Sequence, residues 1–377
     1  MESLKCSIMR AGTSKGIFIL ENELPKDQPE RDKVIQAVFG SPDKRQIDGL
    51  GGADTLTSKL AIIGEATRED ADVDYTFAQV SIDQDLVDYK GNCGNISSGV
   101  GVFAIDEGLV EAVEPITTVR IHQTNTNKLL VAEIPIVNGK PAIKGDFAID
   151  GVPGTGAKIT MDFSDTQGSQ TGKLLPTGNA KDQVEIDGKA YEISIVDAAN
   201  PLVFIRAEDL GMSGIETPDE IDQNASLMNE IEKIRGKAAE MIGLVDEAAD
   251  AAEKSPYIPF FAIVSPSADY HTYNHKDVKA DEVDLVSRLL FMLKMHKTYP
   301  GTGTVCTGAA ARIPGSIVWD LLKEEAKERK VLQIGHPAGI IPVEVEAETE
   351  NGEIQLKRAA FYRTARKILD GTVFINQ

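Results

Sequence analysis

The chain has 377 residues, enough for two domains of ordinary size, since most globular domains contain roughly 100 to 200 residues. Hydrophobic residues make up 42% of the chain and charged residues 26%, so disorder throughout is excluded. The 59 Asp and Glu against 39 Lys and Arg give a formal net charge of -20. This charge excludes nucleic acid and anionic membranes as expected partners, and an anionic substrate would have to be held by local donors.

Cysteine and histidine usage argues against a metal site. The three cysteines and five histidines show neither the spacing of metal ligands nor that of a disulfide framework. Residues 1–16 lack the apolar segment of a secretion signal, and no later run approaches the roughly 18 apolar residues of a membrane helix. We therefore expect a soluble, cytoplasmic protein without a bound metal ion. Homo-oligomer formation is left open.

Strand-like runs punctuated by Pro, Gly and Asp dominate the first half of the chain. The main runs are residues 15–20, 74–82 and 117–137. A hairpin signal follows at residues 138–139 (Asn-Gly), and a second one lies at residues 187–188 (Asp-Gly) within a new strand pattern. The intervening stretch is rich in Gly, Asp, Ser and Thr. We place the domain boundary there, with a first lobe over residues 1–180 and a second over 181–377, and we allow the last residues to pack back on the first lobe.

A buried helix is expected between these strands. The segment begins with the Gly- and Asn-rich residues 91–95 and continues through apolar positions to Gly108. It contains glycines at 94, 99 and 101, each of which costs about 1 kcal/mol in a helix interior. Another element must therefore approach this helix closely.

The second half contains further helix signals. Thr217 to Glu220 form a capping box with Pro at the first helical position, and apolar residues then recur at helical spacing as far as Met241. Residues 283–295 are interpreted as another helix. Residues 300–312 begin with a turn and become small and apolar, which predicts a third.

This last segment repeats the design of the first half. Residues 93–95 (Cys-Gly-Asn) overlay residues 300–302 (Pro-Gly-Thr), so each half offers one Gly-rich helix start. Two such N-termini facing one another would suit the carboxylates of a small acid, because each presents backbone N–H groups and a positive dipole end. The alternative is two unrelated core helices with small residues for close packing.

Two residues could carry chemistry. Cys93 lies at the start of the predicted helix, a place that favours the thiolate form of cysteine; the alternative is a buried, inert thiol. Lys59 borders an apolar strand and is either a surface lysine or, if it points into a closed cleft, a proton donor or acceptor.

Two glycine-containing segments do not support a nucleotide site. Residues 151–158 resemble a phosphate loop, but Ala157 follows Gly156 and no apolar strand leads into the segment. Residues 99–101 lack the third glycine and the acidic partner of a dinucleotide fold. No redox cofactor is implied.

Several strings, found in the same order from residue 9 to about residue 371, resemble one known family. They are residues 9–16 (MRAGTSKG), 49–59, 91–95, 176–179 (PTGN), 303–312, 335–339 (GHPAG) and 363–366 (RTAR). Together they resemble the PrpF-type isomerases, which include 2-methylaconitate cis-trans isomerase, 3-methylitaconate delta-isomerase and 4-oxalomesaconate tautomerase. Ala338 stands where Ser is expected in many relatives, so one hydroxyl is absent from the expected carboxylate site. This difference bears above all on the identity of the substrate.

The resemblance implies the diaminopimelate epimerase fold, an α+β architecture of two similar lobes. Each lobe would be a mainly antiparallel, barrel-like sheet around a central helix, with the site between the lobes. It also implies that Lys59 and Cys93 are the acid and base pair of a cofactor-independent isomerase.

The expected reaction is removal of an allylic proton next to a carboxylate and its return at the same carbon or at the far end of the allyl system. Whether one group or two transfer the proton is left open. Donors to the carboxylates are expected from the two helix starts and three further side chains. These residues are Ser14, Lys15, Thr57, Asn92, Gly94, Asn95, Gly301, Thr302, Gly303 and Thr304.

Two other functions remain as alternatives: an amino-acid epimerase or racemase, and a non-catalytic dicarboxylate-binding protein. Two-base racemases of this fold carry a cysteine at both helix starts. Here Pro300 occupies the second start, and Cys306 lies about a turn and a half further along. A symmetrical two-thiol racemase is therefore disfavoured.

Overall fold

A computed structural model describes residues 2–90, 92–350 and 352–375. The chain forms two compact units: unit 1 consists of Met1–Met161 and Tyr362–Gln377, and unit 2 of Asp162–Phe361. The boundary that we placed near residue 180 therefore lies at residues 161 and 162. The polar stretch after it is not a linker, because the backbone N–H groups of Gln170 and Thr171 donate to the Asp197 carboxylate of unit 2.

Unit 1 contains most of the first half of the chain and its last strand. Its elements are β1 (Glu2–Ala11), β2 (Ser14–Leu20), η1 (Glu21–Glu23), α1 (Gln28–Phe39), β3 (Lys59–Glu65), β4 (Val73–Val80), β5 (Val87–Asp88), α2 (Gly94–Asp106), β6 (Ile116–Gln123), β7 (Lys128–Val137), β8 (Lys140–Pro141), β9 (Phe147–Ala148), β10 (Thr155–Gly156), β11 (Ile159–Asp162) and β23 (Ala365–Ile375). The last residue of β11 already belongs to unit 2.

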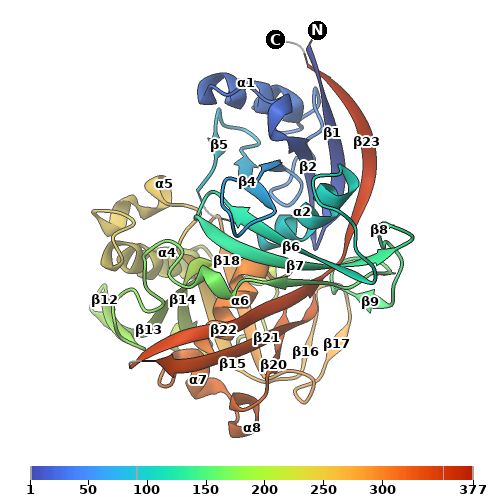
Figure 1. Cartoon of the computed structure of the whole chain (residues 1–377). Helices are drawn as coiled ribbons and strands as arrows, with labels where there is room; N and C mark the ends of the chain where they lie inside the picture. Colours follow the sequence, from blue (N-terminus) through green and yellow to red (C-terminus); the bar gives the residue numbers. More distant parts are fainter. Residues whose placement is uncertain (1, 91, 351, 376–377) are drawn as a thin grey trace. The chain divides into compact units, whose positions relative to one another are not determined.

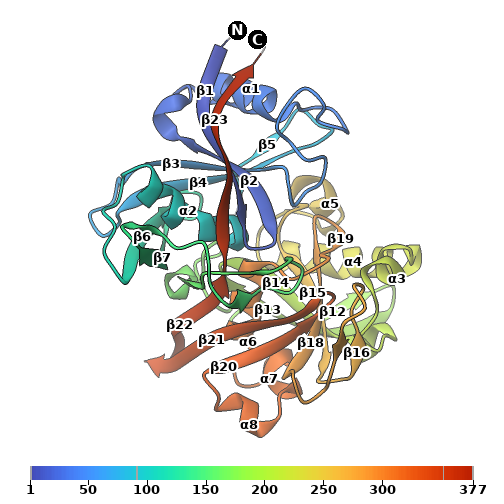
Figure 2. The same cartoon turned by 90° about the vertical axis from the view of Figure 1, so that its right-hand side faces the viewer.

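The strands of unit 1 pair in the order β23, β1, β2, β3, β4, β6, β7 and β8, with β5 along β4. The β2–β3 and β4–β6 pairs are parallel and the others antiparallel. Figure 2 shows β1 and β23 side by side, and their pairing places Glu2 opposite Ile375.

Helix α2 lies against strands from both ends of this order, including β1, β2 and β3 on one side and β6, β7 and β8 on the other (Figure 1). The glycines of α2 allow these strands to pack closely against it. A Cβ atom on Gly99 would lie 2.7 Å from the Phe18 ring, and one on Gly101 would lie 3.1 Å from Ile134. Close approach of β2 therefore needs glycine at position 99, and the contact of Gly101 with β7 is also tight, in agreement with the close approach expected from the sequence.

The opposite face of β2, β3 and β4 packs against α1. Alternate residues of a strand point to opposite faces, so Ile17 and Leu60 contact α1 residues such as Phe39, whereas Phe18 faces α2. This alternation decides which side chains at the ends of these strands can meet the start of α2.

Unit 2 holds the remaining elements. They are η2 (Ser164–Thr166), β12 (Asp182–Ile186), β13 (Lys189–Ala198), β14 (Asn200–Arg206), η3 (Ala207–Leu210), α3 (Pro218–Asp222), α4 (Ala225–Met241), η4 (Ala248–Asp250), α5 (Ala251–Lys254), β15 (Phe260–Pro266), β16 (Tyr270–His271), β17 (Asp277–Val278), β18 (Leu285–Phe291), β19 (Lys294–Met295), α6 (Gly301–Ala310), α7 (Ile317–Leu321), α8 (Glu324–Lys327), β20 (Val331–His336), β21 (Gly339–Glu350) and β22 (Glu353–Arg363), of which the last two residues belong to unit 1.

The strands of unit 2 repeat the topology of unit 1. They pair in the order β12, β13, β14, β15, β18, β20, β21 and β22, and the parallel pairs, β14–β15 and β18–β20, fall at the same places. Helix α6 follows the β18–β19 hairpin as α2 follows β4 and β5. In this correspondence β23 of unit 1, at the end of the chain, takes the place that β12 holds in unit 2.

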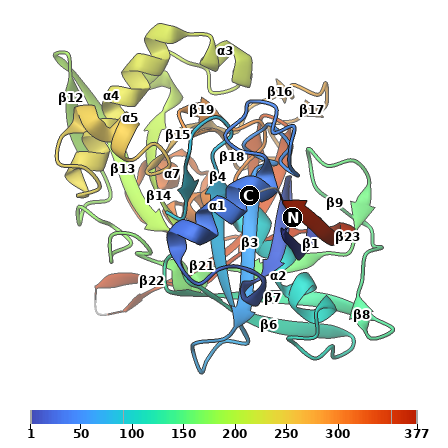
Figure 3. The ribbon, with the colours of Figure 1, turned by 90° about the horizontal axis from the view of Figure 1, so that it is seen from above.

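Of the helix predictions for unit 2, one was wrong and one was correct only in part. Residues 283–295, expected to be helical, form the hairpin of β18 and β19, because their apolar residues fill both faces of a central strand. The capping box at Thr217 is present, but α3 ends at Asp222, and Asn224 caps the separate helix α4. Figure 3 shows α4 beside β12 and β13. Both hairpin signals were correct: residues 138–139 and 187–188 all have positive φ.

In the part of the chain described by the structure, no helix combines the length and the hydropathy needed to cross a membrane.

Candidate active site

Lys59 is the first residue of β3, and its side chain points toward α2. It lies opposite Gly16 of β2 and Gln79 of β4 in the strand register, and it is only 2% exposed. Its Nζ donates a 2.6 Å hydrogen bond to Gln79 Oε1 and lies 5.4 Å from the centre of the Phe77 ring. Lys59 is therefore a buried lysine, not the surface lysine of the alternative interpretation.

The loop before β3 is held by a buried amide, that of Gln46. The Nε2 group of Gln46 donates to the hydroxyls of Ser41 and Ser58, and its Oε1 accepts from the backbone N–H of Ala53. Because these bonds connect both ends of the loop, the start of β3 is fixed in place and Lys59 with it.

Burial lowers the pKa of Lys59 below the ordinary value for lysine. The charged form loses its hydration in the interior, and this effect outweighs the opposing influence of Cys93 and Asp54, which raise the pKa. The lowered pKa means that the amino group of Lys59 gives up its proton more readily than an ordinary lysine and is more available as a base.

Cys93 is the residue that precedes α2, and it is partly exposed. Its carbonyl accepts hydrogen bonds from the N–H and the hydroxyl of Ser97, so the first turn of the helix is well formed. The N–H groups of the first turn, on Gly94, Asn95 and Ile96, have no acceptor within the helix by the geometry of an α-helix. A thiol and several backbone donors therefore meet at one point.

Arg363 also contributes a positive charge near this point. The residue is 1% exposed, and its Nε donates a 2.8 Å hydrogen bond to Asn95 Oδ1. Burial lowers the pKa of Arg363 to about 9, and Cys93 acts in the opposite direction. Asn95 Oδ1 also accepts from the N–H of Thr13, and Asn95 Nδ2 donates to the Thr13 hydroxyl. The side chain of Asn95 therefore joins three segments of unit 1 and leaves its backbone N–H as the group suited to a substrate.

Ser14 faces the same side of β2 as Gly16, toward α2, since the Cβ position of Gly16 points at Ile96. Its hydroxyl oxygen is fully buried and has no hydrogen-bond partner among the described residues. Lys15 lies on the opposite face of β2, the face that packs against α1. The structure therefore brings Ser14, but not Lys15, to the side of the strand that Lys59 shares.

Two other candidates have side chains already engaged within unit 1. The Thr57 hydroxyl donates to the Asp54 carbonyl, and Asn92 Oδ1 accepts from the Ser97 hydroxyl. Their expected roles as substrate donors stay predictions.

The candidates Gly301, Thr302, Gly303 and Thr304 form the first turn of α6 in unit 2, and all are buried. Pro300 precedes this helix as Cys93 precedes α2, so the overlay of the two helix starts is correct. Cys306 lies deeper in α6, where its thiol donates to the Val196 carbonyl and burial strongly raises its pKa. The second thiol of a symmetrical racemase is therefore not found at this helix start.

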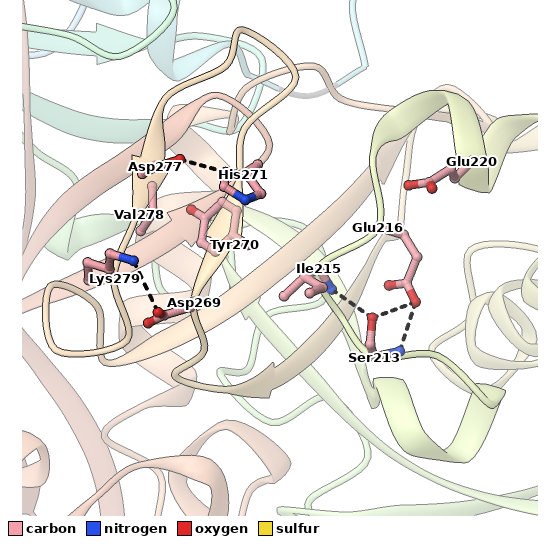
Figure 4. A pocket seen from close by; sticks show the side chains of 10 residues that line it. All are labelled: Ser213, Ile215, Glu216, Glu220, Asp269, Tyr270, His271, Asp277, Val278 and Lys279. Carbon is pink, nitrogen blue, oxygen red and sulfur yellow. Dashed lines mark hydrogen bonds and ion pairs between the residues drawn. The ribbon is translucent and has the colours of Figure 1, made fainter.

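A pocket of about 520 Å³ in unit 2 is unsuited to a dicarboxylate (Figure 4). Four carboxylates line it, and each already has a hydrogen-bond or ion-pair partner nearby: Glu216 has Ser213, Glu220 has Thr217, Asp269 has Lys279 and Asp277 has His271. The surplus of negative charge would repel an anionic substrate.

No group of three or more potential metal ligands occurs among the residues that the structure describes.

No motif or spacing in the sequence selects Gln79, and Arg363 stands out only as part of the matching string at residues 363–366. Gln79 lies in an ordinary strand pattern, and its partner Lys59 is twenty residues away. Arg363 lies 268 residues from Asn95 along the chain. The contact between Arg363 and Asn95 forms because the last segment of the chain, from Tyr362 onward, belongs to unit 1. Local sequence patterns do not reveal such a contact.

Comparison with known proteins gives a consistent result. The family model described as PrpF protein matches residues 1–376. The chain is 56% identical over 375 residues to the 3-methylitaconate isomerase of Eubacterium barkeri, covering 99% of this chain and 97% of that protein. It is 38% identical over 379 residues to the 2-methyl-aconitate isomerase of Shewanella oneidensis, covering 97% and 95%.

Solved structures agree with the sequence comparison. A crystal structure of methylitaconate-delta-isomerase superposes with a TM-score of 0.86 at 55% identity, covering 99% of this chain and 96% of that one. A hydroxyproline epimerase from Agrobacterium vitis has the same fold, with a TM-score of 0.59 at 11% identity and coverage of 98% and 92%. The chain belongs to the PrpF family, and it is an isomerase with the α+β fold of two similar units that the sequence led us to expect.

Proposed function

We propose that this chain moves the double bond of a small unsaturated dicarboxylate by allylic proton transfer, with a 3-methylitaconate-like acid as its substrate. The observation that carries this proposal is the buried Lys59, whose pKa is lowered by burial and which lies close enough to Cys93 for the two groups to influence one another. The resemblance to the Eubacterium barkeri enzyme supports the choice of substrate.

The reaction needs a base, an acid and donors to a carboxylate. A base removes the proton from the carbon that is both allylic and next to a carboxylate, and the C–H electron pair becomes part of a dienolate. An acid then delivers a proton to the far alkene carbon, so the CH₂ group of the substrate becomes a methyl group. No net oxidation or reduction occurs, and Lys59 and Cys93 suffice for both transfers.

The dienolate carries its negative charge largely on carboxylate oxygens, so donors aimed at these oxygens stabilise the transition state. The backbone N–H groups at the start of α2 and the Ser14 hydroxyl are suited to this role in unit 1. The start of α6, residues 301–304, stays a predicted second source of backbone donors. The charge of Arg363 offsets part of the protein's overall negative charge near Cys93.

The proposed function is tested by incubating the purified protein with 3-methylitaconate, cis- and trans-2-methylaconitate, 4-oxalomesaconate and several amino acids, followed by proton NMR. We expect conversion of 3-methylitaconate, seen as loss of the alkene CH₂ signals and gain of a methyl signal. Conversion of an amino acid to its enantiomer, with no turnover of any unsaturated acid, would contradict the proposal.

Ser14→Ala tests the carboxylate-binding role. Loss of a hydrogen bond to a charged group costs about 1.5 to 3 kcal/mol, so we expect kcat/KM to fall about tenfold to a hundredfold. The melting temperature should be unchanged or higher, because the hydroxyl is buried without a partner in the described residues and its removal relieves a desolvation cost. A large drop in melting temperature with an unchanged kcat/KM would show that Ser14 is structural.

A further inference from the structure

The side-chain amide of Gln79 has one orientation fixed by the structure. Its Nε2 group donates to the backbone carbonyls of Thr55, at 3.2 Å, and Ser58, at 2.9 Å. Carbonyl oxygens only accept hydrogen bonds, so the NH₂ end must face them. The oxygen end is therefore turned toward Lys59, whose Nζ donates to it at 2.6 Å.

We propose that Gln79 is a positioning residue for Lys59, holding its amino group through a neutral acceptor so that the same hydrogen bond forms in both protonation states of the lysine. An amino group keeps at least two N–H bonds after it loses a proton, so it can donate to Gln79 throughout the reaction. This inference rests on the proposed function, in which Lys59 transfers a proton.

The neutral charge of the acceptor matters as much as its position. A carboxylate at the same place would pair with the ammonium form, raise the pKa of Lys59 and oppose the effect of burial. The charged and titratable groups that influence Lys59 are Asp54 in the loop before β3 and Cys93 at the start of α2. On β4, the strand that supplies Gln79, the neighbouring contact is the uncharged Phe77 ring.

Two substitutions separate charge from position. Gln79→Glu places a negative charge beside Lys59 and raises its proton affinity. The limb of the pH–rate profile that belongs to Lys59 then moves to higher pH, by roughly one pH unit or more. The direction is the same whether Lys59 acts as base or acid, because in either role the limb follows its titration.

Gln79→Met keeps the length of the side chain but removes the acceptor. The limb should then move to lower pH, because the ammonium form loses a hydrogen bond. The value of kcat should fall roughly tenfold to a hundredfold, since the amino group loses its fixed position. If Gln79 had only a structural role, both substitutions would lower stability, but the Lys59 limb of the pH–rate profile would not move in opposite directions in the two variants.

Gln123→Met is the matched control. Gln123 is a fully buried amide of unit 1, on β6, which accepts a hydrogen bond from the N–H of Thr126. Its removal should lower the melting temperature as Gln79→Met does, but leave the pH–rate profile in place.

The experiment measures the pH–rate profiles of the parent and the three variants with 3-methylitaconate, together with ¹⁵N NMR titration of Lys59 in protein labelled at lysine, assigned with Lys59→Met. Opposite movements of the Lys59 titration in Gln79→Glu and Gln79→Met support the inference. An unmoved titration in both, in a parent enzyme that turns over 3-methylitaconate, overturns it. A parent protein inactive on every unsaturated acid overturns the proposed function instead, and the NMR titration still decides the role of Gln79.

Discussion

Lys59→Met should lower kcat by about 10² to 10⁴-fold while the protein remains folded, because removal of a general acid or base typically costs this much. Methionine has a similar length and is apolar, so it loses the cation–π contact with Phe77 but fills most of the space that Lys59 occupies between β3 and β4. Steady-state kinetics with 3-methylitaconate, together with the melting temperature, measures both expectations.

Lys59→Arg separates proton transfer from charge. Arginine keeps the positive charge, but its guanidinium does not lose a proton under ordinary conditions, so this variant should be as impaired as Lys59→Met. Lys90→Ala, at an exposed lysine in the segment leading to Cys93, is the control and should keep full activity. If Lys59→Arg retained activity within a few-fold of the parent, the side chain would act as a fixed charge and not in proton transfer.

Cys93→Ser should be the second severe variant, with kcat again reduced by about 10² to 10⁴-fold. A hydroxyl has nearly the size of a thiol but is a far weaker acid, so the variant keeps the packing at the start of α2 and loses the proton-transfer group. Assays of kcat together with a circular dichroism spectrum distinguish loss of chemistry from loss of the helix.

Cys306→Ser is the matched control for this prediction. Its thiol is buried, donates to the Val196 carbonyl, and has a raised pKa, so serine should preserve the hydrogen bond and most of the activity. Iodoacetamide should inactivate the parent enzyme by modifying Cys93. If mass spectrometry found inactivation with Cys306 labelled and Cys93 intact, the assignment of the two helix starts would be wrong.

The repeat of two lobes could be predicted from the sequence because it depends on local patterns. A glycine-rich helix start recurs at residues 93–95 and 300–302, and the short hairpins at residues 138–139 and 187–188 need only local turn chemistry. The prediction of a helix at residues 283–295 was wrong because an apolar run of this length fits a buried strand as well as a helix. Only the pairing of β18 with β15 and β20 decides between them.

Some residues of the candidate site could likewise be predicted from the sequence, and others could not. Lys59 and Cys93 could be selected from the sequence and the family resemblance, and the alternation along β2 now separates Ser14 from Lys15. Gln79 could not be selected, because its role depends on two backbone carbonyls that the loop before β3 presents to it. The role of Gln79 arises from tertiary contacts, so no motif or residue spacing in the sequence marks it.

The central claim, that Lys59 and Cys93 carry the allylic proton, is tested most directly by running the reaction in deuterium oxide and following it by NMR. With the parent enzyme, we expect the methyl group formed from 3-methylitaconate to contain deuterium from the solvent. With the double variant Lys59→Met, Cys93→Ser, neither product nor exchange of the allylic hydrogen should appear. Deuterated product formed by the double variant at a rate near that of the parent would contradict the account.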